Sequence, residues 1–416
     1  MTAQEYGLPS FFQQRVDPES ENAEDVVPQL LRALRRHLGL QVAFVSRFSH
    51  DRRVIEYVDA SPGAAAMITP GDSHVREETY CQRIVDGRLP ELIPDARAEP
   101  EADRLAVTDS LSIGSYLGVP IRFSDGTVYG TFCGIGEKPD ESLNQRDVEL
   151  MRVFADIAAR LLEHEAQQSR EAEEIRLRTR GVLEAGGMSM VFQPILRLNT
   201  SRTVGLEALA RFRSEQPAGP DIWFNQAARV GLGAELEMRA VEMALDALGQ
   251  LPSEVYVSCN VSPEVAVSEP LLQLLCGVRP ERVVLEITEH AYVSDYERLA
   301  RALAPLRQRG MRLAVDDAGA GYASFRHILA LQPDLIKLDM SLTQGIDTHP
   351  GRRALAAALI RFAQETGSQI VAEGVETAGE LEVLRALQAH VVQGYLIGRP
   401  LRLADACERL QAETRL

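Results

Sequence analysis

The sequence has 416 residues, of which 45% are hydrophobic, so it is long enough for about two or three domains with packed cores. Its 60 acidic and 44 basic residues give a net charge of −16, which argues against binding to nucleic-acid polymers, because that needs a basic surface. No apolar run approaches the roughly 18 residues of a membrane span, and the N-terminus lacks the basic and apolar regions of a signal peptide. We therefore expect a cytoplasmic protein that has no membrane partner.

The elements of the first half predict an arm followed by an α+β domain. Residues 1–23 are polar and contain two prolines, which is typical of a loose arm. Apolar residues recur at helical spacing from Val26 to Leu38. Four strand-like segments follow, the last two joined by a hairpin turn at Ser124-Asp-Gly126: Gln41–Phe48, Arg53–Val58, Gly114–Phe123 and Thr127–Gly134.

Residues 24–163 resemble a GAF domain, a family of α+β sensor domains. The resemblance rests on the segments Glu78–Asp95, Gly114–Ile121 and Gly126–Phe132 and on a closing helix. The Asn-Lys…Phe…Asp-Glu pattern of the cyclic-nucleotide-binding members is missing, and Cys81 lacks the following histidine of many bilin-binding members. The resemblance therefore implies an unknown small ligand, or a domain used only for dimerisation, and His74 is a weak candidate for a haem ligand.

The pattern of residues 145–185 predicts one long helix. Residues 164–187 connect the two domains. Leu150, Phe154, Ile157 and Leu161 follow the 4-3-4 spacing of a coiled-coil seam. Two interpretations stay open: a domain-closing helix with a charged spacer, or a parallel helix that dimerises the protein and transmits a signal. We expect a homodimer on the second interpretation.

Residues 188–416 alternate short apolar runs with helical segments, which predicts a parallel α/β sheet. About eight such units predict a closed (β/α)8 barrel of the TIM type, in which functional groups gather at the carboxyl ends of the strands. The runs carry a polar residue near their ends, and these residues are Glu207, Asn260, Glu286, Asp316, Asp317, Lys337, Glu373 and Gln393.

Oxygen ligands without histidine at these strand ends favour Mg²⁺ or Mn²⁺ over zinc or copper. The adjacent acids Asp316 and Asp317 are suited to a pair of ions, although either could instead cap the following helix. Lys337 lies in an otherwise apolar strand, where an unpaired charge is costly, so we expect anionic neighbours. Glu373 and Glu376 add two acids at another strand end.

The second domain resembles the EAL family of cyclic di-GMP phosphodiesterases. The resemblance rests on motifs that span the domain: Gln193–Ile195, Glu207-Ala208-Leu209, Asn260–Ser262, Glu286–Glu289, Asp316–Tyr322, Asp334–Asp339, Ala372–Glu376 and Gln393–Pro400. It implies a TIM-like barrel whose first strand runs against the others.

The resemblance also implies a role for individual residues. Glu207, Asn260, Glu286 and Asp316 resemble the ligands of one metal ion, and Asp317 helps to hold a second. Lys337 resembles the residue that orients the attacking water, Glu373 the general base, and Gln393 and Glu376 supporting catalytic residues. Glu289 resembles the anchor of the loop Asp317–Ser324. The resemblance implies substrate contacts from Gln193, Leu209, Arg211, Asp339 and Pro400.

The implied activity is the hydrolysis of cyclic di-GMP to linear pGpG, with two Mg²⁺ or Mn²⁺ ions and with regulation by the GAF-like domain. Ala318, Ala320 and Ala323 depart from the loop pattern of the family, so a receptor that binds cyclic di-GMP without cutting it is the alternative. A barrel enzyme acting on phospholipid head groups is a more distant one. No GGDEF run is present in the sequence.

Overall fold

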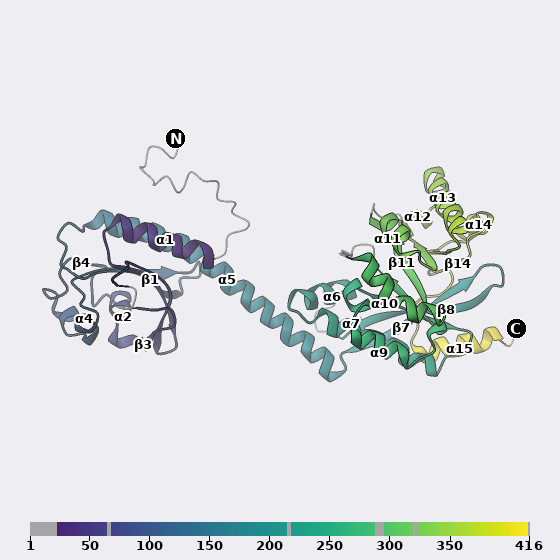
Figure 1. The fold of residues 1–416 in the computed structure, drawn as a ribbon, viewed down its shortest axis with the longest axis horizontal. Coiled ribbons are helices and arrows are strands. Elements are labelled where there is room, and N and C mark those ends of the chain that lie inside the picture. The colour runs from purple at the N-terminus through teal and green to yellow at the C-terminus, as the bar shows by residue number, and fades with distance from the viewer. Residues whose placement is uncertain (1–22, 65–67, 214–217, 288–294, 319–322, 415–416) are drawn as a thin grey trace. The chain divides into compact units, whose positions relative to one another are not determined.

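The computed structural model describes residues 23–64, 68–213, 218–287, 295–318 and 323–414 (Figure 1). The chain divides into two compact units, Met1–Glu171 and Ala172–Leu416, with the division inside the long helix α5 (Gln145–Ala185). Among the described residues, no helix combines the length and the apolar character that crossing a membrane requires.

The first unit is built on an antiparallel sheet of six strands in the order β3-β2-β1-β6-β5-β4. The hairpin predicted around Ser124–Gly126 joins β5 to β6, and an α+β domain is confirmed. The strands are β1 (Val42–Ser49), β2 (Arg52–Ala60), β3 (Ser73–Val75), β4 (Leu92–Ile93), β5 (Ser115–Arg122) and β6 (Val128–Gly136).

Both faces of this sheet are covered. Helices α1 (Ala23–His37) and α5 pack on one face, and the short helices α2 (Tyr80–Val85), α3 (Pro100–Asp103) and α4 (Ala106–Ser110) pack on the other. Alternation along β1 supplies both cores, because Ala43 and Val45 face α1 while Val42 and Phe44 face α2.

Helix α5 begins and ends where the sequence predicts it, but its apolar seam is used within the first unit. Phe154 is buried in the core beneath α1, and Leu150, Ile157 and Leu161 pack against the same core. The 4-3-4 spacing therefore reflects packing on the sheet of the unit to which the helix belongs, while Leu150, Ile157 and Leu161 stay partly exposed.

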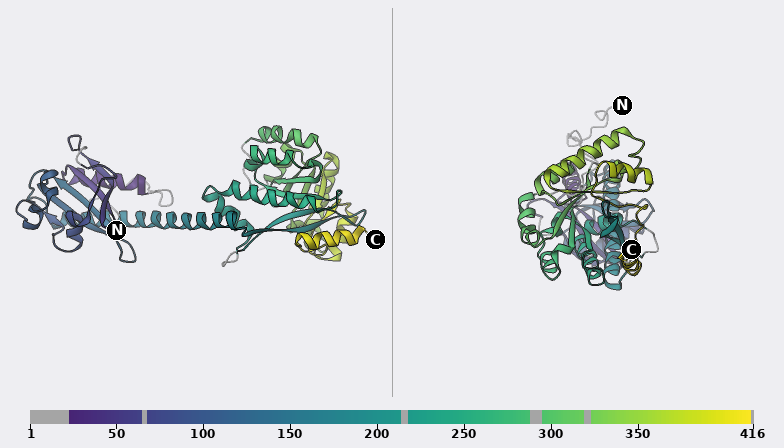
Figure 2. Two further views of the ribbon diagram at one scale, coloured as in Figure 1. Left: turned by 90° about the horizontal axis from the view of Figure 1, so that it is seen from below. Right: turned by 90° about the vertical axis from the view of Figure 1, so that its right-hand side faces the viewer.

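The second unit is a closed barrel with the strand order β10-β11-β12-β13-β14-β7-β8-β9 (Figures 1 and 2). Strand β7 runs antiparallel to both neighbours and all other pairs are parallel, which confirms the predicted topology. The strands are β7 (Met188–Arg197), β8 (Arg202–Phe212), β9 (Tyr256–Val261), β10 (Val283–Ile287), β11 (Arg312–Ala318), β12 (Leu335–Leu338), β13 (Gln369–Ala372) and β14 (Val391–Val392).

Helices cover the outside of the barrel. They are α6 (Pro220–Arg229), α7 (Gly233–Asp246), α8 (Pro263–Ala266), α9 (Glu269–Cys276), α10 (Tyr296–Gln308), α11 (Ala323–Leu331), α12 (Met340–Thr343), α13 (Pro350–Thr366), α14 (Ala378–Ala386) and α15 (Leu403–Thr414). Trp223, the only tryptophan of the sequence, is buried on α6 and stacks on Phe212. Its fluorescence therefore reports unfolding of the second unit.

Alternation along the parallel strands sorts side chains between the barrel interior and the helices. In β10, Val283, Leu285 and Ile287 belong to the core shared with the helices, whereas Val284 belongs to an interior layer. The members of this interior layer are Ile195, Tyr256, Val284, Ala314, Leu335, Val371 and Val391. The layer closes the barrel below the strand ends, as in other TIM-type barrels.

A buried arginine connects two segments of the chain at the amino end of the parallel strands. Arg282 lies in the short 3-10 turn Pro280–Arg282 and donates hydrogen bonds to the carbonyls of Leu248, Leu251, Pro252 and Val255. We expect Arg282→Met to lower the free energy of unfolding of the second unit by about 3 kcal/mol, because buried acceptors would lose charge-assisted donors. Urea unfolding followed by Trp223 fluorescence measures the loss.

Arg279→Met is the matched control, because the Arg279 side chain is exposed and forms an ion pair with the exposed Glu281. Its effect should stay within about 0.5 kcal/mol. Equal losses in the two variants would contradict a structural role for the buried guanidinium.

Candidate active site at the mouth of the barrel

The functional side chains stand directly above the interior apolar layer. Alternation places Glu286 two residues after Val284, Asp316 two after Ala314, Lys337 two after Leu335, and Glu373 two after Val371. Gln193 comes two residues before Ile195, because β7 runs in the opposite direction. One periodicity therefore explains why these residues share the mouth of the barrel.

Lys337 lies at the centre of this layer and is 2% exposed. Its Nζ lies 2.7 Å from Glu286 Oε2, 2.8 Å from Glu373 Oε1, 3.1 Å from Asp316 Oδ1 and 3.3 Å from Glu207 Oε1. The expectation that this lysine has anionic neighbours is confirmed. A single ammonium group cannot balance four carboxylates, so the cluster retains an excess of negative charge.

Glu207 lies in the middle of β8 and not at its end. The pairing of β8 with β9 stops at Ala208, whereas its pairing with β7 continues to Phe212. The β7–β8 hairpin thus extends beyond the barrel, and Glu207 stands at the point where the barrel itself ends.

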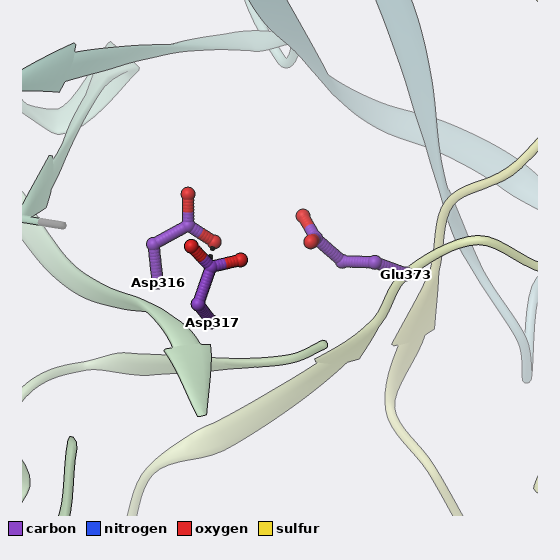
Figure 3. Close-up of side chains that lie close together, drawn as sticks. All are labelled: Asp316, Asp317 and Glu373. Carbon is purple, nitrogen blue, oxygen red and sulfur yellow. Dashed lines mark hydrogen bonds between the residues drawn. The ribbon is translucent and has the colours of Figure 1, made fainter. Parts of the chain in front are cut away.

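Asp316 and Asp317 both face the site, which regular alternation in a strand would forbid. The pairing of β11 with β12 shifts between Val315 and Ala318, and Asp317 adopts a positive φ of 54°, which is uncommon for any residue except glycine. Figure 3 shows both aspartates on the same side, opposite Glu373. Each of the three carboxylates offers an oxygen atom, and these atoms lie within 4.8 Å of one another, close enough to share a metal ion.

A hydrogen-bond network orients the carboxylates. Gln393 Nε2 donates to Glu207 Oε2 and to Gln193 Oε1, and Gln193 Nε2 donates to the carbonyl of Gly398 at 3.2 Å. Asn260 Nδ2 donates to Glu207 Oε1 at 3.3 Å, and Ser258 Oγ donates to Glu286 Oε1. Glu207 therefore receives donors from three sides before any cation binds.

The turn after Glu373 requires glycine. Gly374 adopts a positive φ of 67°, and a Cβ there would come within 2.6 Å of Met340 Cβ. This close approach places α12 against the strand end that carries Glu373.

The carboxylates differ in their affinity for protons. Burial raises the pKa of Glu286 to about 8, and burial also raises the pKa of Glu373 well above its usual value. Burial acts in the same direction on Glu207, but the charge of Lys337 and the hydrogen bond from Gln393 lower its pKa. Burial alone would lower the pKa of Lys337, and the surrounding carboxylates instead raise it well above its usual value. Lys337 is therefore a permanent cation here.

A pocket of about 290 Å³ opens above this layer. Its walls are formed by Gln193, Glu207, Leu209, Asp316, Asp317, Lys337, Asp339, Met340, Gln344, Glu373, Gly374, Glu376, Gln393, Gly394 and Tyr395. Asp339 also caps α12 through the backbone N–H of Ser341, and Gln344 Nε2 donates to Glu376.

Some residues singled out by the sequence do not line this pocket. Glu286 is buried beneath the pocket. Asn260 does not line the pocket, but its Nδ2 donates to Glu207, which does. Arg211 is exposed on the protruding hairpin, where its Nη1 donates to the carbonyl of Ala210, and Pro400 also lies outside the lining. Glu289 and Ala320 lie outside the described residues, Ala318 is buried at the end of β11, and Ala323 begins α11.

The sequence analysis missed Ser258, Met340, Gln344 and Tyr395. Ser258 could have been found from alternation, because it precedes Asn260 by two residues on β9. Tyr395 is half exposed at the rim, with the guanidinium of Arg399 4.2 Å from the centre of its ring. Met340 and Gln344 belong to α12 and its end, and no sequence pattern indicates that this turn covers the pocket.

Substitution of Lys337 tests whether its ammonium group stabilises the buried carboxylates. In the presence of EDTA, Lys337→Met should lower the free energy of unfolding of the second unit by about 3 kcal/mol or more, because buried carboxylates lose their partner. Lys138, the only other lysine of the sequence, is exposed, and Lys138→Met is the matched control. Trp223 fluorescence in urea measures both variants, and an equally small effect in each would contradict a central role of Lys337.

The pH dependence of stability follows from the raised carboxylate pKa values. Burial raises the pKa of Glu286 to about 8 and raises the pKa of Glu373 well above its usual value. Above the usual glutamate pKa, the folded protein therefore holds protons that the unfolded chain has released, and for Glu286 this range ends at about pH 8. Without divalent cations, stability of the second unit should therefore fall as the pH rises from about 5 to about 8. Glu286→Gln, which keeps a neutral group there, should flatten this slope, and an unchanged slope would show that Glu286 does not titrate in this range.

The sequence matches two known domain families. Residues 174–400 match the EAL domain and residues 20–163 match the GAF domain. The cyclic di-GMP phosphodiesterase NbdA of Pseudomonas aeruginosa is 32% identical over 264 residues, which are 61% of this chain and 33% of NbdA. The probable cyclic di-GMP phosphodiesterase PdeD of Escherichia coli is 30% identical over 223 residues, 51% of this chain and 41% of PdeD. The chain spans between 33% and 38% of the length of three curated relatives that it matches, NbdA among them.

Solved structures share the fold of the second unit. An EAL domain protein from Listeria monocytogenes superposes with a TM-score of 0.51 at 23% identity, over 56% of this chain and 95% of that one. The PaMucR phosphodiesterase, solved as a complex with c-di-GMP, gives a TM-score of 0.51 at 23% identity, over 56% of this chain and 99% of that one. Because the family match covers more than half of the sequence and the barrel topology agrees with it, this chain belongs to the EAL domain family.

Proposed function

We propose that this protein hydrolyses cyclic di-GMP to linear 5′-pGpG in a reaction that depends on divalent metal ions. The observation that carries the proposal is the cluster of carboxylates around Lys337 at the mouth of an EAL barrel. Its excess negative charge would repel a phosphodiester unless cations are bound, and its oxygen-only composition suits Mg²⁺ or Mn²⁺. The similarity to NbdA and PdeD supports the same substrate.

Two groups of ligands would hold two ions. Glu207, Asn260, Glu286 and Asp316 would hold the first, with the carbonyl oxygen of Asn260 as ligand because its Nδ2 already donates to Glu207. Asp316, Asp317 and Glu373 would surround the second, and their oxygens are close enough for this. When bound, such ions lower the pKa of a water molecule and stabilise the leaving oxygen of a phosphodiester.

The residues of the chain would position the water and take its proton. Lys337 Nζ, fixed by its carboxylates, would orient the water toward the phosphorus, and Glu373, 2.8 Å from this nitrogen, would act as the general base. Glu373 must be deprotonated for this role, and cations at the site would oppose the burial that raises its pKa. Gln393 would hold Glu207 in place, and Glu376 would support the rim of the pocket.

Substrate contacts would come from both sides of the pocket. Gln193, Leu209 and Asp339 line it and would contact the dinucleotide directly. Arg211 would have to turn away from the carbonyl of Ala210 to reach a phosphate, and Pro400 would contact the substrate from outside the present lining. Glu289 keeps its proposed role as anchor of the loop after Asp317.

Chromatographic analysis of the products of cyclic di-GMP, with Mg²⁺, Mn²⁺ or EDTA, tests this function on the full chain. We expect linear pGpG only with metal. Glu207→Gln should reduce kcat by more than the roughly 10- to 100-fold that loss of an outer-shell partner costs, because it removes a ligand. Glu254→Gln, at an exposed glutamate that precedes β9 at the end of the strand away from the site, is the matched control and should keep full turnover.

Tight binding of cyclic di-GMP without product at saturating metal would contradict the hydrolase and support the receptor. Full turnover of Glu207→Gln would contradict the assignment of the metal ligands, whether or not the protein is a hydrolase.

We also propose that the protein is a homodimer whose first unit binds a small ligand and regulates the barrel. The seam residues Leu150, Ile157 and Leu161 pack against their own unit but stay partly exposed, and α5 also exposes the apolar residues Val153 and Leu177, so this helix offers apolar surface to a second copy. Light scattering of the full chain in solution tests the dimer, and a monomer at micromolar concentration would contradict it.

A further inference from the structure

Two thiols meet in the interior of the first unit. Cys81 on α2 and Cys133 on β6 are both buried, and their Sγ atoms lie 3.9 Å apart. They are separated by 52 residues in the sequence, so only the packing of α2 on the sheet brings them together. This is the distance of two sulfur atoms in contact, and no covalent bond joins them.

The surroundings of this pair are polar, in contrast to those of an ordinary buried cysteine. Tyr116 Oη lies 3.6 Å and Ser46 Oγ 3.7 Å from Cys81 Sγ, and the Cys133 thiol donates to Thr131 Oγ1 at 3.1 Å. Cys259, by comparison, is buried among the apolar residues between the barrel and its helices. Hydroxyl donors around a sulfur stabilise its anionic form.

A buried cation adds to this environment. Arg53 on β2 is 4% exposed, and within the described part of the chain its Nε and Nη1 have no hydrogen-bond acceptor, while Nη2 contacts His74 Nδ1 at 3.3 Å. A guanidinium without an acceptor is costly to bury, so a negative charge nearby would stabilise the folded state. The charge of Arg53 acts on Asp72 and on Cys81, and both groups could supply such a negative charge.

The two thiols differ in acidity. The contact with Cys133 is the largest influence that lowers the pKa of Cys81, and the charge of Arg53 acts in the same direction against the effect of burial. Burial and the neighbouring sulfur instead raise the pKa of Cys133 well above its usual value. The pair thus combines a thiolate that can attack with a thiol that can resolve the product.

We propose that Cys81 and Cys133 form a redox-active dithiol that hydroperoxides oxidise to an intramolecular disulfide. The Cys81 thiolate attacks the outer oxygen of the hydroperoxide, the O–O bond breaks, and Cys81 sulfenic acid and an alcohol (or water, from hydrogen peroxide) form. The Cys133 thiol then attacks the sulfenic sulfur, an S–S bond forms, and water leaves. The dithiol loses two electrons and two protons, which reduce the peroxide.

Formation of the disulfide requires a local change in the first unit. The sulfurs must approach from 3.9 Å to the roughly 2.05 Å of a disulfide, so the two side chains must move. Cys81 is carried by the six-residue helix α2, which packs on the sheet through its side chains. Both thiols are covered in the closed structure, so peroxide reaches them in local openings.

Peptide mapping of the full chain after oxidation tests the proposal. Cys276→Ser and Cys407→Ser first remove the exposed and the half-exposed thiol, and Cys259 remains as a buried control. Treatment of the folded protein with hydrogen peroxide, alkylation and mass spectrometry should then show a Cys81–Cys133 linked peptide and a mass lower by two hydrogen atoms. Dithiothreitol should restore both thiols, and Cys259 should stay reduced.

Single substitutions separate the two roles. Cys133→Ser should accumulate a Cys81 sulfenic acid that dimedone traps, whereas Cys81→Ser should trap none at Cys133. Circular dichroism checks that each variant is folded, and mapping of the protein that retains both thiols does not depend on the variants. The proposal is overturned if both thiols stay reduced in the folded protein under peroxide that fully oxidises the exposed Cys276 of the unsubstituted chain.

Discussion

The placement of one lysine inside a closed barrel governs the second unit. Lys337 is buried where strand alternation points it inward, above a layer of apolar side chains. A buried ammonium group is stable only among anions, and the adjacent strands supply carboxylates at the same level. These acids in turn carry more negative charge than the lysine can balance. The carboxylates that stabilise buried Lys337 therefore also form a site for cations. The stability of the barrel without metal ions and its ability to bind them thus follow from the same arrangement of charged side chains.

The two units use alternation differently. In the barrel, it separates an apolar layer facing the helices from an interior that ends in charged groups. In the first unit, it supplies apolar cores on both faces of an antiparallel sheet, and polar groups lie beneath α2, around Cys81 and Cys133. The residues around Lys337, and those around Cys81 and Cys133, come from elements that are distant in the sequence. Such clusters are costly unless every group finds a partner, which favours chemistry over packing as their purpose.

Much of the candidate site could be predicted from the sequence because the strands are short and regular. Glu286, Lys337 and Glu373 each follow an apolar run, and the parallel topology brings such positions to one end of the barrel. Other features depended on distortions that leave no periodic signal. Asp317 reaches the site only through a shifted strand pairing and a positive φ, and Glu207 marks the end of the barrel in the middle of a longer strand. Arg211 lies on the part of that strand which extends past the barrel, so its spacing from Glu207 did not indicate its position relative to the pocket.

The sequence by itself determined the two domain types, the closed barrel with a reversed first strand, the long helix and the residue types at the strand ends, because these follow from local periodicity and from recognisable motifs. Only the tertiary structure decided what each of these segments packs against. The apolar seam of α5 has the spacing of a coiled coil, yet Phe154 is buried and Leu150, Ile157 and Leu161 are partly buried on its own sheet, since the same periodicity serves either partner. The contact of Cys81 with Cys133 and the partners of Lys337 likewise depend on distances between elements, and no local pattern contains that information.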